Sequence, residues 1–301
     1  MIEIRPCTDD ADDEESLAIY NAVWPWDAVS MHEVRSWRTQ VTEWADFLAP
    51  GAGSADVALT PWHPGIGQAH VCVLPGQRRK GVGTALYHAV SGWLSARGID
   101  VLDVTVPEDD PASVEFAAKR GFHEERRSER LVLDLTGLEP PPIAPPKGIE
   151  IVTWAERPDL IQGIYEVAAE SAPDIPGEED AVVEPFEDWL AHDMHGSGDR
   201  PEATFVALAG DEVVGYAKFS LTVAQPTTAH HDLTAVRRAW RGKGIAGALK
   251  RTQVAWAKEH GYERLVTVPD LRNEPSRRMN QRLGYQPAPG KIFMRGPLAE
   301  R

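Results

Sequence analysis

A cationic, glycine-rich segment near residue 240 has the composition of a phosphate-binding turn. Backbone N–H groups at a helix N-terminus lack intrahelical partners and carry a partial positive charge, so they favour anions. Glycine lets the backbone close around such an anion, and arginine adds charge-assisted hydrogen bonds. The residues predicted to bind an anion in this way are Arg237, Arg241, Gly242, Lys243, Gly244, Ile245, Ala246 and Gly247.

The residues on either side of this turn have the patterns of a strand and a helix. Residues 233–236 form a short strand-like run, and apolar residues recur at helical spacing from Ile245 to Trp256. Gly261 then predicts the end of the helix. A strand–turn–helix unit therefore positions the cationic turn at a helix N-terminus.

The same unit occurs a second time, 163 residues earlier in the chain. The earlier turn follows a strand-like run over 71–74, and Gly81 corresponds to Gly244 (244 − 81 = 163). The same offset relates Gly98 to Gly261, Asp110 to Asn273, Ser113 to Ser276, and Gly121-Phe122 to Gly284-Tyr285. The chain is therefore predicted to contain two copies of one unit. The earlier anion-binding set is Arg78, Arg79, Lys80, Gly81, Val82, Gly83 and Thr84.

Length and a proline-rich segment predict how the two copies are organised. A chain of 301 residues is long enough for about two domains of ordinary size. Residues 139–148 contain five prolines, which preclude a helix and favour a stiff linker. We therefore expect an N-terminal domain at 1–138, a linker at 139–148 and a C-terminal domain at 149–301.

The composition is that of a globular protein with an acidic surface, since the net charge is −15. This charge argues against a nucleic-acid or anionic-membrane partner and permits a cationic substrate. The chain starts without a signal-peptide pattern and has no apolar run of membrane-spanning length, so we expect a cytoplasmic protein. Cys7 and Cys72 lack metal-binding spacing, and we predict buried reduced thiols and no metal site.

The spacing of Gly242, Gly244 and Gly247 also matches the dinucleotide-binding fingerprint. That fingerprint follows the first strand of its domain, whereas this turn lies in mid-domain, and the earlier copy lacks two of the three glycines. No Gly-Lys-Ser/Thr sequence follows either turn, which excludes a P-loop. A dinucleotide-dependent oxidoreductase is therefore a distant alternative.

Both turns share the pattern Arg-x-x-Gly-x-Gly/Ala, at 78–83 and 241–246. In the order of their flanking elements they resemble the acetyl-CoA pyrophosphate loop of the GNAT acyltransferases. The resemblance covers nearly the whole chain, which looks like a tandem GNAT protein. It implies two domains of mixed α/β fold, each with a twisted sheet that splays at the strand before the turn.

The resemblance also implies which residues contact acetyl-CoA. Both turns would hold its pyrophosphate, while Val73, with Leu74 beside it, and Val236 would lend backbone groups to its pantetheine. Asn273, Ser276 and Asn280 resemble a second segment that faces coenzyme A. The alternative for this segment is a helix cap at its first residue and ordinary surface for the rest.

One departure from the family concerns the departing thiolate. Many members place a protonating tyrosine four residues before the Gly-Phe/Tyr pair, where this chain has Ala117 and Asn280. A thiol with a pKa of about 8.5 is a tolerable leaving group, and water or another group such as Tyr285 can supply the proton. Because Asp110 also replaces the asparagine found at 273, the first copy is more degenerate and we expect catalysis in the second.

The resemblance implies direct transfer of an acetyl group to an amine. Asp232 is the candidate base, because strand alternation gives it the same face as Thr234 and Val236, whereas His231 points the other way. His231 and Asn280, the latter at the tyrosine position, complete the candidate catalytic set.

An acidic segment over 172–202 occupies the part of the chain that covers the acceptor in this family. It favours a small cationic amine such as an amino sugar, a polyamine or an aminoglycoside. The alternative function is a non-catalytic acyl-CoA-binding or sensing protein. Both a monomer and a homodimer are compatible with the sequence.

Overall fold

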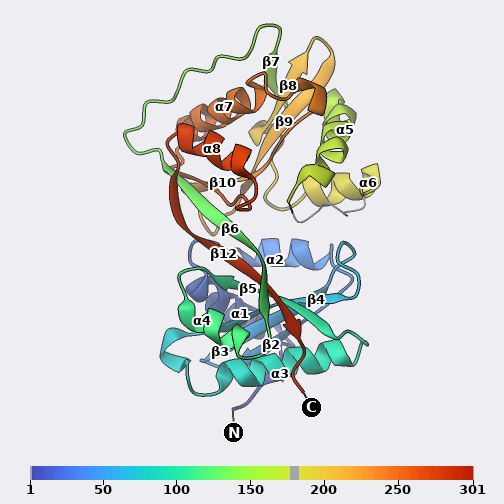
Figure 1. Ribbon diagram of the computed structural model, residues 1–301, viewed down its shortest axis with the longest axis vertical. Coiled ribbons are helices and arrows are strands. Elements are labelled where there is room, and N and C mark those ends of the chain that lie inside the picture. Colours follow the sequence, from blue (N-terminus) through green and yellow to red (C-terminus); the bar gives the residue numbers. More distant parts are fainter. Residues whose placement is uncertain (1, 177–182, 301) are drawn as a thin grey trace. The chain divides into compact units, whose positions relative to one another are not determined.

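A computed structural model describes residues 2–176 and 183–300 (Figure 1). The chain forms two compact units: unit 1 comprises Met1–Arg127 and Pro289–Arg301, and unit 2 comprises Ser128–Ala288. Each unit has a mixed sheet with helices on both faces. The mixed α/β class predicted from the sequence is confirmed.

Unit 1 has the strand order β1-β2-β3-β4-β5-β12, in which only β4 and β5 are parallel neighbours. Its elements are β1 (Arg5–Pro6), α1 (Asp10–Val23), α2 (Met31–Arg38), β2 (Glu43–Ala49), β3 (Gly53–Leu59), β4 (Ile66–Val73), the 3-10 turn η1 (Pro75–Gln77), α3 (Val82–Ser95), β5 (Val101–Pro107), α4 (Pro111–Ala118), the start of β6 (His123–Asp134) and most of β12 (Gln286–Pro297).

Unit 2 has the strand order β6-β11-β10-β9-β8-β7, with β10 and β11 as its parallel pair. Its elements are β7 (Glu150–Thr153), η2 (Pro158–Leu160), α5 (Ile161–Ser171), η3 (Ala172–Asp174), α6 (Phe186–Trp189), the π-helical turn η4 (Leu190–Met194), η5 (Pro201–Ala203), β8 (Thr204–Ala209), β9 (Glu212–Leu221), β10 (Thr228–Val236), η6 (Arg238–Trp240), α7 (Ile245–Glu259), β11 (Arg264–Thr267) and α8 (Glu274–Arg282).

Each unit takes one strand from the other half of the chain. The C-terminal strand β12 pairs with β5 of unit 1, from Lys291 opposite Pro107 to Pro297 opposite Val101. The second part of β6 pairs with β11 of unit 2. The compact units therefore divide within β6 and β12, whereas the sequence placed the boundary in the proline-rich segment 139–148. That segment lies inside unit 2, because β6 has already entered it.

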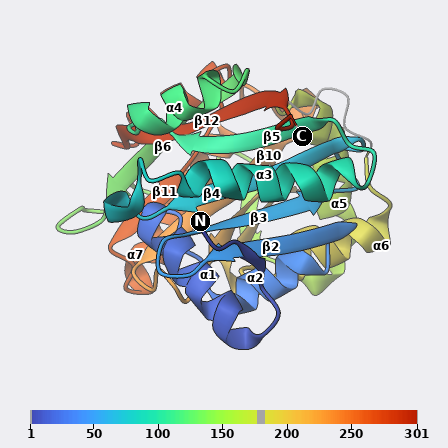
Figure 2. The same ribbon diagram turned by 90° about the horizontal axis from the view of Figure 1, so that it is seen from below.

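The helices of unit 1 cover opposite faces of its sheet. α3 packs against β2, β3 and β4 (Figure 2), and buries Leu86, Val90 and Leu94 with Val57. On the other face, α1 contributes Ile19 to a smaller cluster that includes Cys72. Cys72 is buried and free, as predicted, and Cys7 is a partly buried free thiol.

The sheet of unit 2 is covered in the corresponding way. α7 packs on the face that contains Phe219 and Tyr285, and α5 packs on the face that contains Tyr216. Phe219 and Tyr216 are three residues apart on β9 and point to opposite sides of the sheet, as strand alternation requires. The two faces of unit 2 are therefore an α7 side and an α5 side.

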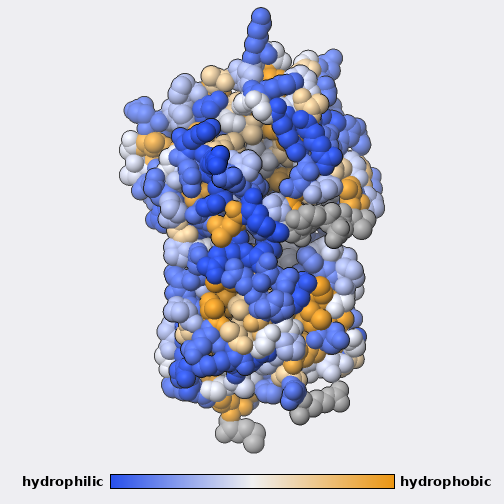
Figure 3. All heavy atoms as spheres, viewed as in Figure 1, coloured by the Kyte–Doolittle hydropathy of each residue, from blue (hydrophilic) through white to orange (hydrophobic). Residues whose placement is uncertain are grey.

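The surface agrees with the acidic composition. The face drawn in Figure 3 is largely hydrophilic, with small scattered apolar areas. Among the described residues, no helix is long and apolar enough to cross a membrane.

Candidate functional site

The two cationic turns have the same backbone conformation. In each, a 3-10 turn leads from the strand to an arginine, Arg78 or Arg241, with φ −66° and ψ 158°. A residue with left-handed φ follows, Arg79 at 63° in unit 1 and Gly242 at 74° in unit 2. The repeat predicted from the sequence is therefore present in the structure.

Glycine is needed where each turn meets its helix. Gly81 and Gly244 precede α3 and α7 with φ of 91° and 86°, which costs other residues roughly 1–2 kcal/mol. No described side chain caps either helix start. The first N–H groups of both helices are therefore available to an external acceptor such as a phosphate oxygen.

The arginine after each 3-10 turn lies against the end of its strand. Arg78 Nε donates to the carbonyl of Val73 at 3.3 Å, and Arg241 Nε donates to the carbonyl of Val236 at 3.0 Å. This hydrogen bond holds the guanidinium beside the helix N-terminus, where its charge adds to the attraction for an anion.

The strand before each turn separates from its parallel neighbour. β4 pairs with β5 over 66–69 and β10 pairs with β11 over 228–230, yet the strands continue to Val73 and Val236. Backbone groups near the ends of these strands therefore face a gap in the ladder, where an extended ligand can replace the missing strand partner. This is the splay that the resemblance implied.

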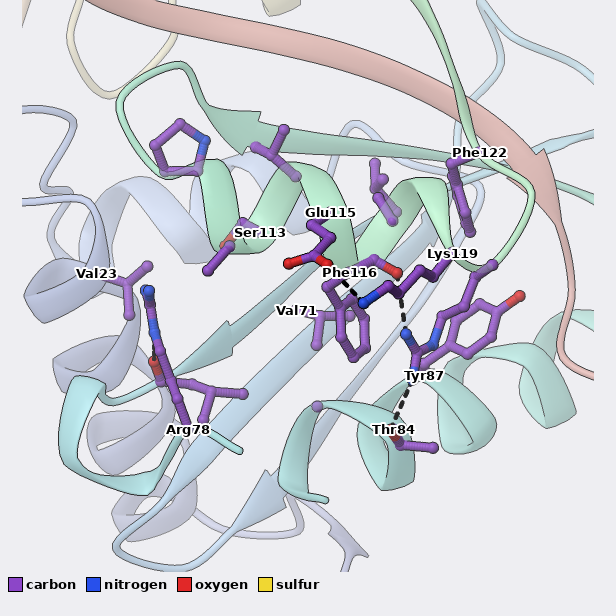
Figure 4. Close-up of a pocket in the computed structure, with 18 of the residues that line it drawn as sticks. Val23, Val71, Arg78, Thr84, Tyr87, Ser113, Glu115, Phe116, Lys119 and Phe122 are labelled. Atoms are coloured by element: carbon purple, nitrogen blue, oxygen red, sulfur yellow. Dashed lines mark hydrogen bonds and ion pairs between the residues drawn. The ribbon is translucent and has the colours of Figure 1, made fainter. Parts of the chain in front are cut away.

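In unit 1 a cavity of about 390 Å³ lies between α3, α4 and the diverging strands (Figure 4). Small-molecule sites typically have volumes of roughly 300–1,000 Å³. Thr84 and Tyr87 from α3 face Phe116 from α4 across it (Figure 4). The predicted cofactor-binding residues that line this cavity are Val73, Arg78, Arg79, Gly81, Gly83 and Thr84.

Three residues predicted for the first turn do not line the cavity. Val82 is buried in the core beneath α3, and Leu74 packs in the cluster on the α1 side. Lys80 Nζ donates to Gly76 O and Gln77 Oε1, both at 2.9 Å. The side chains of all three are therefore occupied within unit 1.

In unit 2 carboxylates from α5 and η3 face the arginines of the turn. The ion pairs are Glu166–Arg237 at 2.6 Å, Asp174–Arg238 at 2.9 Å and Asp174–Arg241 at 2.7 Å. Glu170 accepts the backbone N–H of Arg238 at 2.6 Å. Hydrogen bonds from Arg238 and Arg241 lower the pKa of Asp174 to about 2. An anionic ligand at this turn must therefore compete with Asp174.

β10 contains a β-bulge, a feature that β4 lacks. His231 pairs with Phe219 and Thr234 pairs with Ala217, so three steps along β10 oppose two along β9. The pairing of β3 with β4 is continuous. A bulge leaves one residue outside the ladder and redirects the side chains around it. The two repeats therefore differ at the strand that leads into the turn.

The bulge corrects the predicted orientation of Asp232. Regular alternation gave it the face of Thr234 and Val236, but Val236 packs on the α7 side. Asp232 instead pairs at 2.7 Å with Lys218, which lies two residues from Tyr216 and shares its α5 side. The Asp232 side chain is 43% exposed, so its carboxylate reaches solvent on the α5 side.

Lys218 is buried at the centre of a carboxylate cluster. Its Nζ lies 2.7 Å from Asp232 and 2.9 Å from Asp199, and it donates to the backbone carbonyl of Asp193. Burial disfavours a charged lysine, but these carboxylates outweigh burial and raise the Lys218 pKa. Burial raises the pKa of Asp193 to about 6. Three carboxyl groups surround one ammonium, so the cluster favours a further cation.

Part of the predicted acidic segment 172–202 contributes to this cluster through Asp193 and Asp199. Its residues Glu178, Glu179 and Asp180 lie outside the described residues.

His231 points to the α7 side, where it is buried. Its Nδ1 lies 3.0 Å from Gln253 Oε1 and its Nε2 lies 2.5 Å from the Tyr285 hydroxyl. Burial and the nearby Lys250 lower the His231 pKa well below its usual value. The neutral ring links β10 to α7 and to Tyr285, which directly precedes β12.

The predicted second segment forms helix α8. Asn273 Oδ1 accepts the Ser276 N–H at 3.2 Å, which is the helix cap proposed as the alternative. Asn280 is fully buried, and its Nδ2 donates to Ser276 O at 3.0 Å. Asn280 Oδ1 has no partner among the described residues.

The sequence analysis missed Lys250. It is only 3% exposed and has no hydrogen bond or ion pair within the described part of the chain. The internal repeat could have identified it, because the offset of 163 relates Lys250 to Tyr87, which lines the unit 1 cavity. In the described ranges, no group of His, Cys, Asp and Glu is arranged to hold a metal ion.

The chain has two copies of an arrangement that suits an anionic, extended ligand: an uncapped helix start, a cationic turn and a splayed strand. A family model described as "Acetyltransferase (GNAT) family" matches residues 52–122 and 161–285, and the chain belongs to this family. It is an N-acetyltransferase with two GNAT repeats, as the sequence predicted, and enzymes of this family use acetyl-CoA.

Curated relatives and solved structures agree with this assignment. The mycothiol acetyltransferase of Catenulispora acidiphila is 27% identical over 225 residues, which is 72% of this chain and 68% of the relative. The mycothiol acetyltransferase of Nocardia farcinica is 25% identical over 234 residues, which is 75% of this chain and 72% of the relative.

Two solved structures share the fold. A tandem GNAT protein from the clavulanic acid biosynthesis pathway has a TM-score of 0.74 at 21% identity and covers 99% of both chains. A GCN5-related N-acetyltransferase from Sphaerobacter thermophilus has a TM-score of 0.74 at 20% identity, covering 99% of this chain and 96% of its own.

Proposed function

We propose that unit 2 transfers the acetyl group of acetyl-CoA to the primary amine of a small cationic molecule by direct attack on the thioester. The observation that carries this assignment is the bulge in β10, the strand that leads directly into the cationic turn. A bulge frees backbone N–H groups from the ladder, and such groups can stabilise the oxyanion that forms during acyl transfer. The corresponding strand of unit 1 is regular.

The turn of unit 2 would hold the pyrophosphate. The residues that we assign to acetyl-CoA there are Val236, Arg237, Arg241, Gly242, Lys243, Gly244, Ile245, Ala246 and Gly247, with Asn273, Ser276 and Asn280 from α8. The uncapped N–H groups of α7 and the Arg241 guanidinium, fixed against Val236, fit a phosphate. Asp174 must release Arg241 when the anion binds. The bound cosubstrate supplies the activated acetyl group.

Asp232 is our candidate for the group that accepts the proton of the attacking amine. It lies in the bulged part of β10, its carboxylate is partly exposed, and Lys218 holds it in place at 2.7 Å. Positioning of both reactants supplies a large part of such rate enhancements, so one carboxylate within reach of the amine is sufficient. His231 is assigned a structural role, because its ring nitrogens are already paired with Gln253 and Tyr285.

The acceptor is proposed to be cationic because of the carboxylate cluster around Lys218. The cluster has three carboxyl groups, those of Asp193, Asp199 and Asp232, but only one ammonium group. Asp232 is the carboxylate most exposed to solvent. An acceptor with a second ammonium group therefore gains attraction that a neutral amine lacks. The named relatives make a mycothiol precursor one acceptor to test beside amino sugars, polyamines and aminoglycosides.

Unit 1 is proposed to bind acyl-CoA without catalysing transfer. The 390 Å³ cavity beside its turn supports binding, and the continuous β3–β4 ladder argues against catalysis. A protein that only binds or senses acyl-CoA is the second candidate function, and the same unit 1 cavity favours it.

The test is calorimetric titration with acetyl-CoA of the wild-type protein and of Gly81→Glu and Gly244→Glu, with turnover assays on the same samples. The two variants are a matched pair, because both glycines have the same left-handed backbone and carry the same strain. Circular dichroism checks that each variant is folded.

We expect Gly244→Glu to abolish turnover and remove one binding site, and Gly81→Glu to retain turnover. Turnover that survives Gly244→Glu but not Gly81→Glu would transfer catalysis to unit 1. Binding without turnover of any cationic or neutral amine would favour the sensing function. Full activity of Asp232→Asn at every pH would remove Asp232 as the base.

A further inference from the structure

Lys250 is a buried lysine without a counter-charge. The residue is 3% exposed, and no described residue forms a hydrogen bond or ion pair with it. The other fully buried lysine of unit 2, Lys218, has two carboxylates within 3 Å, at 2.7 and 2.9 Å. Burying an unpaired ammonium lowers the stability of the fold. A lysine at this position is therefore better explained by a role in function than by a contribution to stability.

The repeat relates Lys250 to a residue in the wall of the unit 1 cavity. α3 and α7 bury the same face: Val82, Leu86, Tyr87, Val90, Ser91 and Leu94 in α3 correspond at offset 163 to Ile245, Leu249, Lys250, Gln253, Val254 and Ala257 in α7. Tyr87 lines the cavity of unit 1, where it is drawn beside Thr84 and Lys119 (Figure 4). Lys250 therefore occupies the corresponding wall position beside the splayed strand of unit 2.

Unit 1 also has a cation at this wall, but it comes from another position. Arg120, which follows α4, donates to Thr84 Oγ1 at 2.7 Å and lies over the ring of Phe116 at 3.5 Å. The residues of unit 2 at these three positions, by the offset of 163, are Leu283, Gly247 and Met279. Unit 2 therefore lacks an arginine at the position of Arg120, but it has Lys250 on α7 where unit 1 has Tyr87 on α3. Each unit thus has one basic side chain in this region.

Unit 2 needs a proton donor at this place. In the family a tyrosine protonates the departing thiolate, and Asn280 occupies its position. The Asn280 amide cannot act as an acid, and it is already bonded to Ser276. Tyr285 is held by His231 at 2.5 Å, and burial raises its pKa further above the usual value. Lys250 is an ionisable group on the buried face of α7 that has no partner among the described residues.

We propose that the Lys250 ammonium protonates the sulfur of coenzyme A as it departs, in place of the missing tyrosine; this inference rests on the proposed function of unit 2. The acceptor nitrogen forms a bond to the thioester carbonyl carbon, the carbon–sulfur bond breaks, and Lys250 gives one proton to the sulfur. Asp232 takes the proton lost by the nitrogen. After the products leave, Asp232 releases its proton to solvent and Lys250 takes one up, so atoms and charge balance.

The acidity of Lys250 suits this role. Burial lowers its pKa to about 7, whereas a thiol has a pKa of about 8.5. Proton transfer from this ammonium to a thiolate is therefore favourable by more than one pKa unit. A lysine with its usual pKa near 10.5 would be a poor donor to the same sulfur.

The experiment compares the affinity of coenzyme A with that of desulfo-coenzyme A, which lacks the sulfur. Calorimetry is done at pH 6, below the Lys250 pKa of about 7, and in the Gly81→Glu background, so that Lys250 is charged and the signal comes from unit 2. The variants are Lys250→Met, which removes the charge at similar length, and Lys250→Tyr, which introduces the residue that unit 1 holds at this position. Lys147→Met, in the exposed linker, is the control for loss of one charge.

With Lys250 present, coenzyme A should bind at least tenfold more tightly than desulfo-coenzyme A, because the ammonium donates a hydrogen bond to the sulfur. Lys250→Met and Lys250→Tyr should reduce the ratio to less than twofold, and Lys147→Met should leave it unchanged. A ratio that is retained in both folded Lys250 variants, or that is already near one with Lys250 present, overturns the proposal. If neither compound binds, the proposed function of unit 2 itself fails.

Discussion

Replacing Lys250 by methionine should stabilise the protein while it impairs the chemistry. Lys250 has no described hydrogen-bond or ion-pair partner and is 3% exposed, so methionine of similar length can fill its place without leaving a buried charge. Tyr87 shows that the same helix position accepts a larger uncharged side chain in unit 1.

The magnitude follows from the pKa of Lys250. Burial lowers it from 10.5 to about 7, a difference of roughly 3.5 units, or on the order of 5 kcal/mol at 1.36 kcal/mol per unit. The folded-state pKa lies below the unfolded one, so the unfolded state binds the additional proton between them. The lysine therefore costs most stability below pH 7, progressively less as the pH rises to 10.5, and nothing above that.

The assay is urea unfolding of the wild-type protein and Lys250→Met at pH 6, 8 and 9.5, followed by circular dichroism. The variant should gain several kcal/mol at pH 6, and the gain should shrink by about 1.4 kcal/mol per pH unit above pH 7. His231 on β10 interacts electrostatically with Lys250, so Lys250→Met in a His231→Gln background tests for its contribution. A variant that is less stable at pH 6, or a gain independent of pH, would refute an unpaired ammonium at this place.

Three further changes test other features of the site. Asp174→Asn frees Arg238 and Arg241, so we expect acetyl-CoA to bind several-fold more tightly by calorimetry; weaker binding would mean that Asp174 helps to shape the turn. Gly242→Ala forces a side chain into a φ of 74° with open space around it, and chemical denaturation should show a loss of about 1 kcal/mol from backbone strain alone. Lys218→Met leaves buried carboxylates without their cation and should cost about 3–5 kcal/mol in the same assay, whereas an unchanged stability would show that Asp193 and Asp199 become protonated at little cost.

The turns, the repeat and the fold class could be predicted from the sequence because their signals are local. Gly81 and Gly244 mark left-handed positions directly, and the arginines beside them are adjacent in the chain. Asn273 and Asp110 cap their helices through residues three positions away, which sequence also captures.

The orientation of Asp232 could not be predicted, because it depends on pairing. The bulge between His231 and Thr234 is defined only by what lies opposite on β9, and one additional residue moves the carboxylate to the other face of the sheet. The carboxylates that oppose the arginines come from α5 and η3, 64 to 71 residues earlier, and no local pattern links them. The burial of Lys250 likewise depends on the sheet and helices packed around α7.

The exchange of β6 and β12 bears on how such a chain arises and how it folds during synthesis. The two strands have equal length and begin at His123 and Gln286, which the offset of 163 relates to each other. Joining the two chains of a dimer that had traded its last strand would produce this connectivity. In the present protein the strand that completes the sheet of unit 1 follows all the strands of unit 2 in the chain. During synthesis β5 therefore stays unpaired on one side until β12 has left the ribosome.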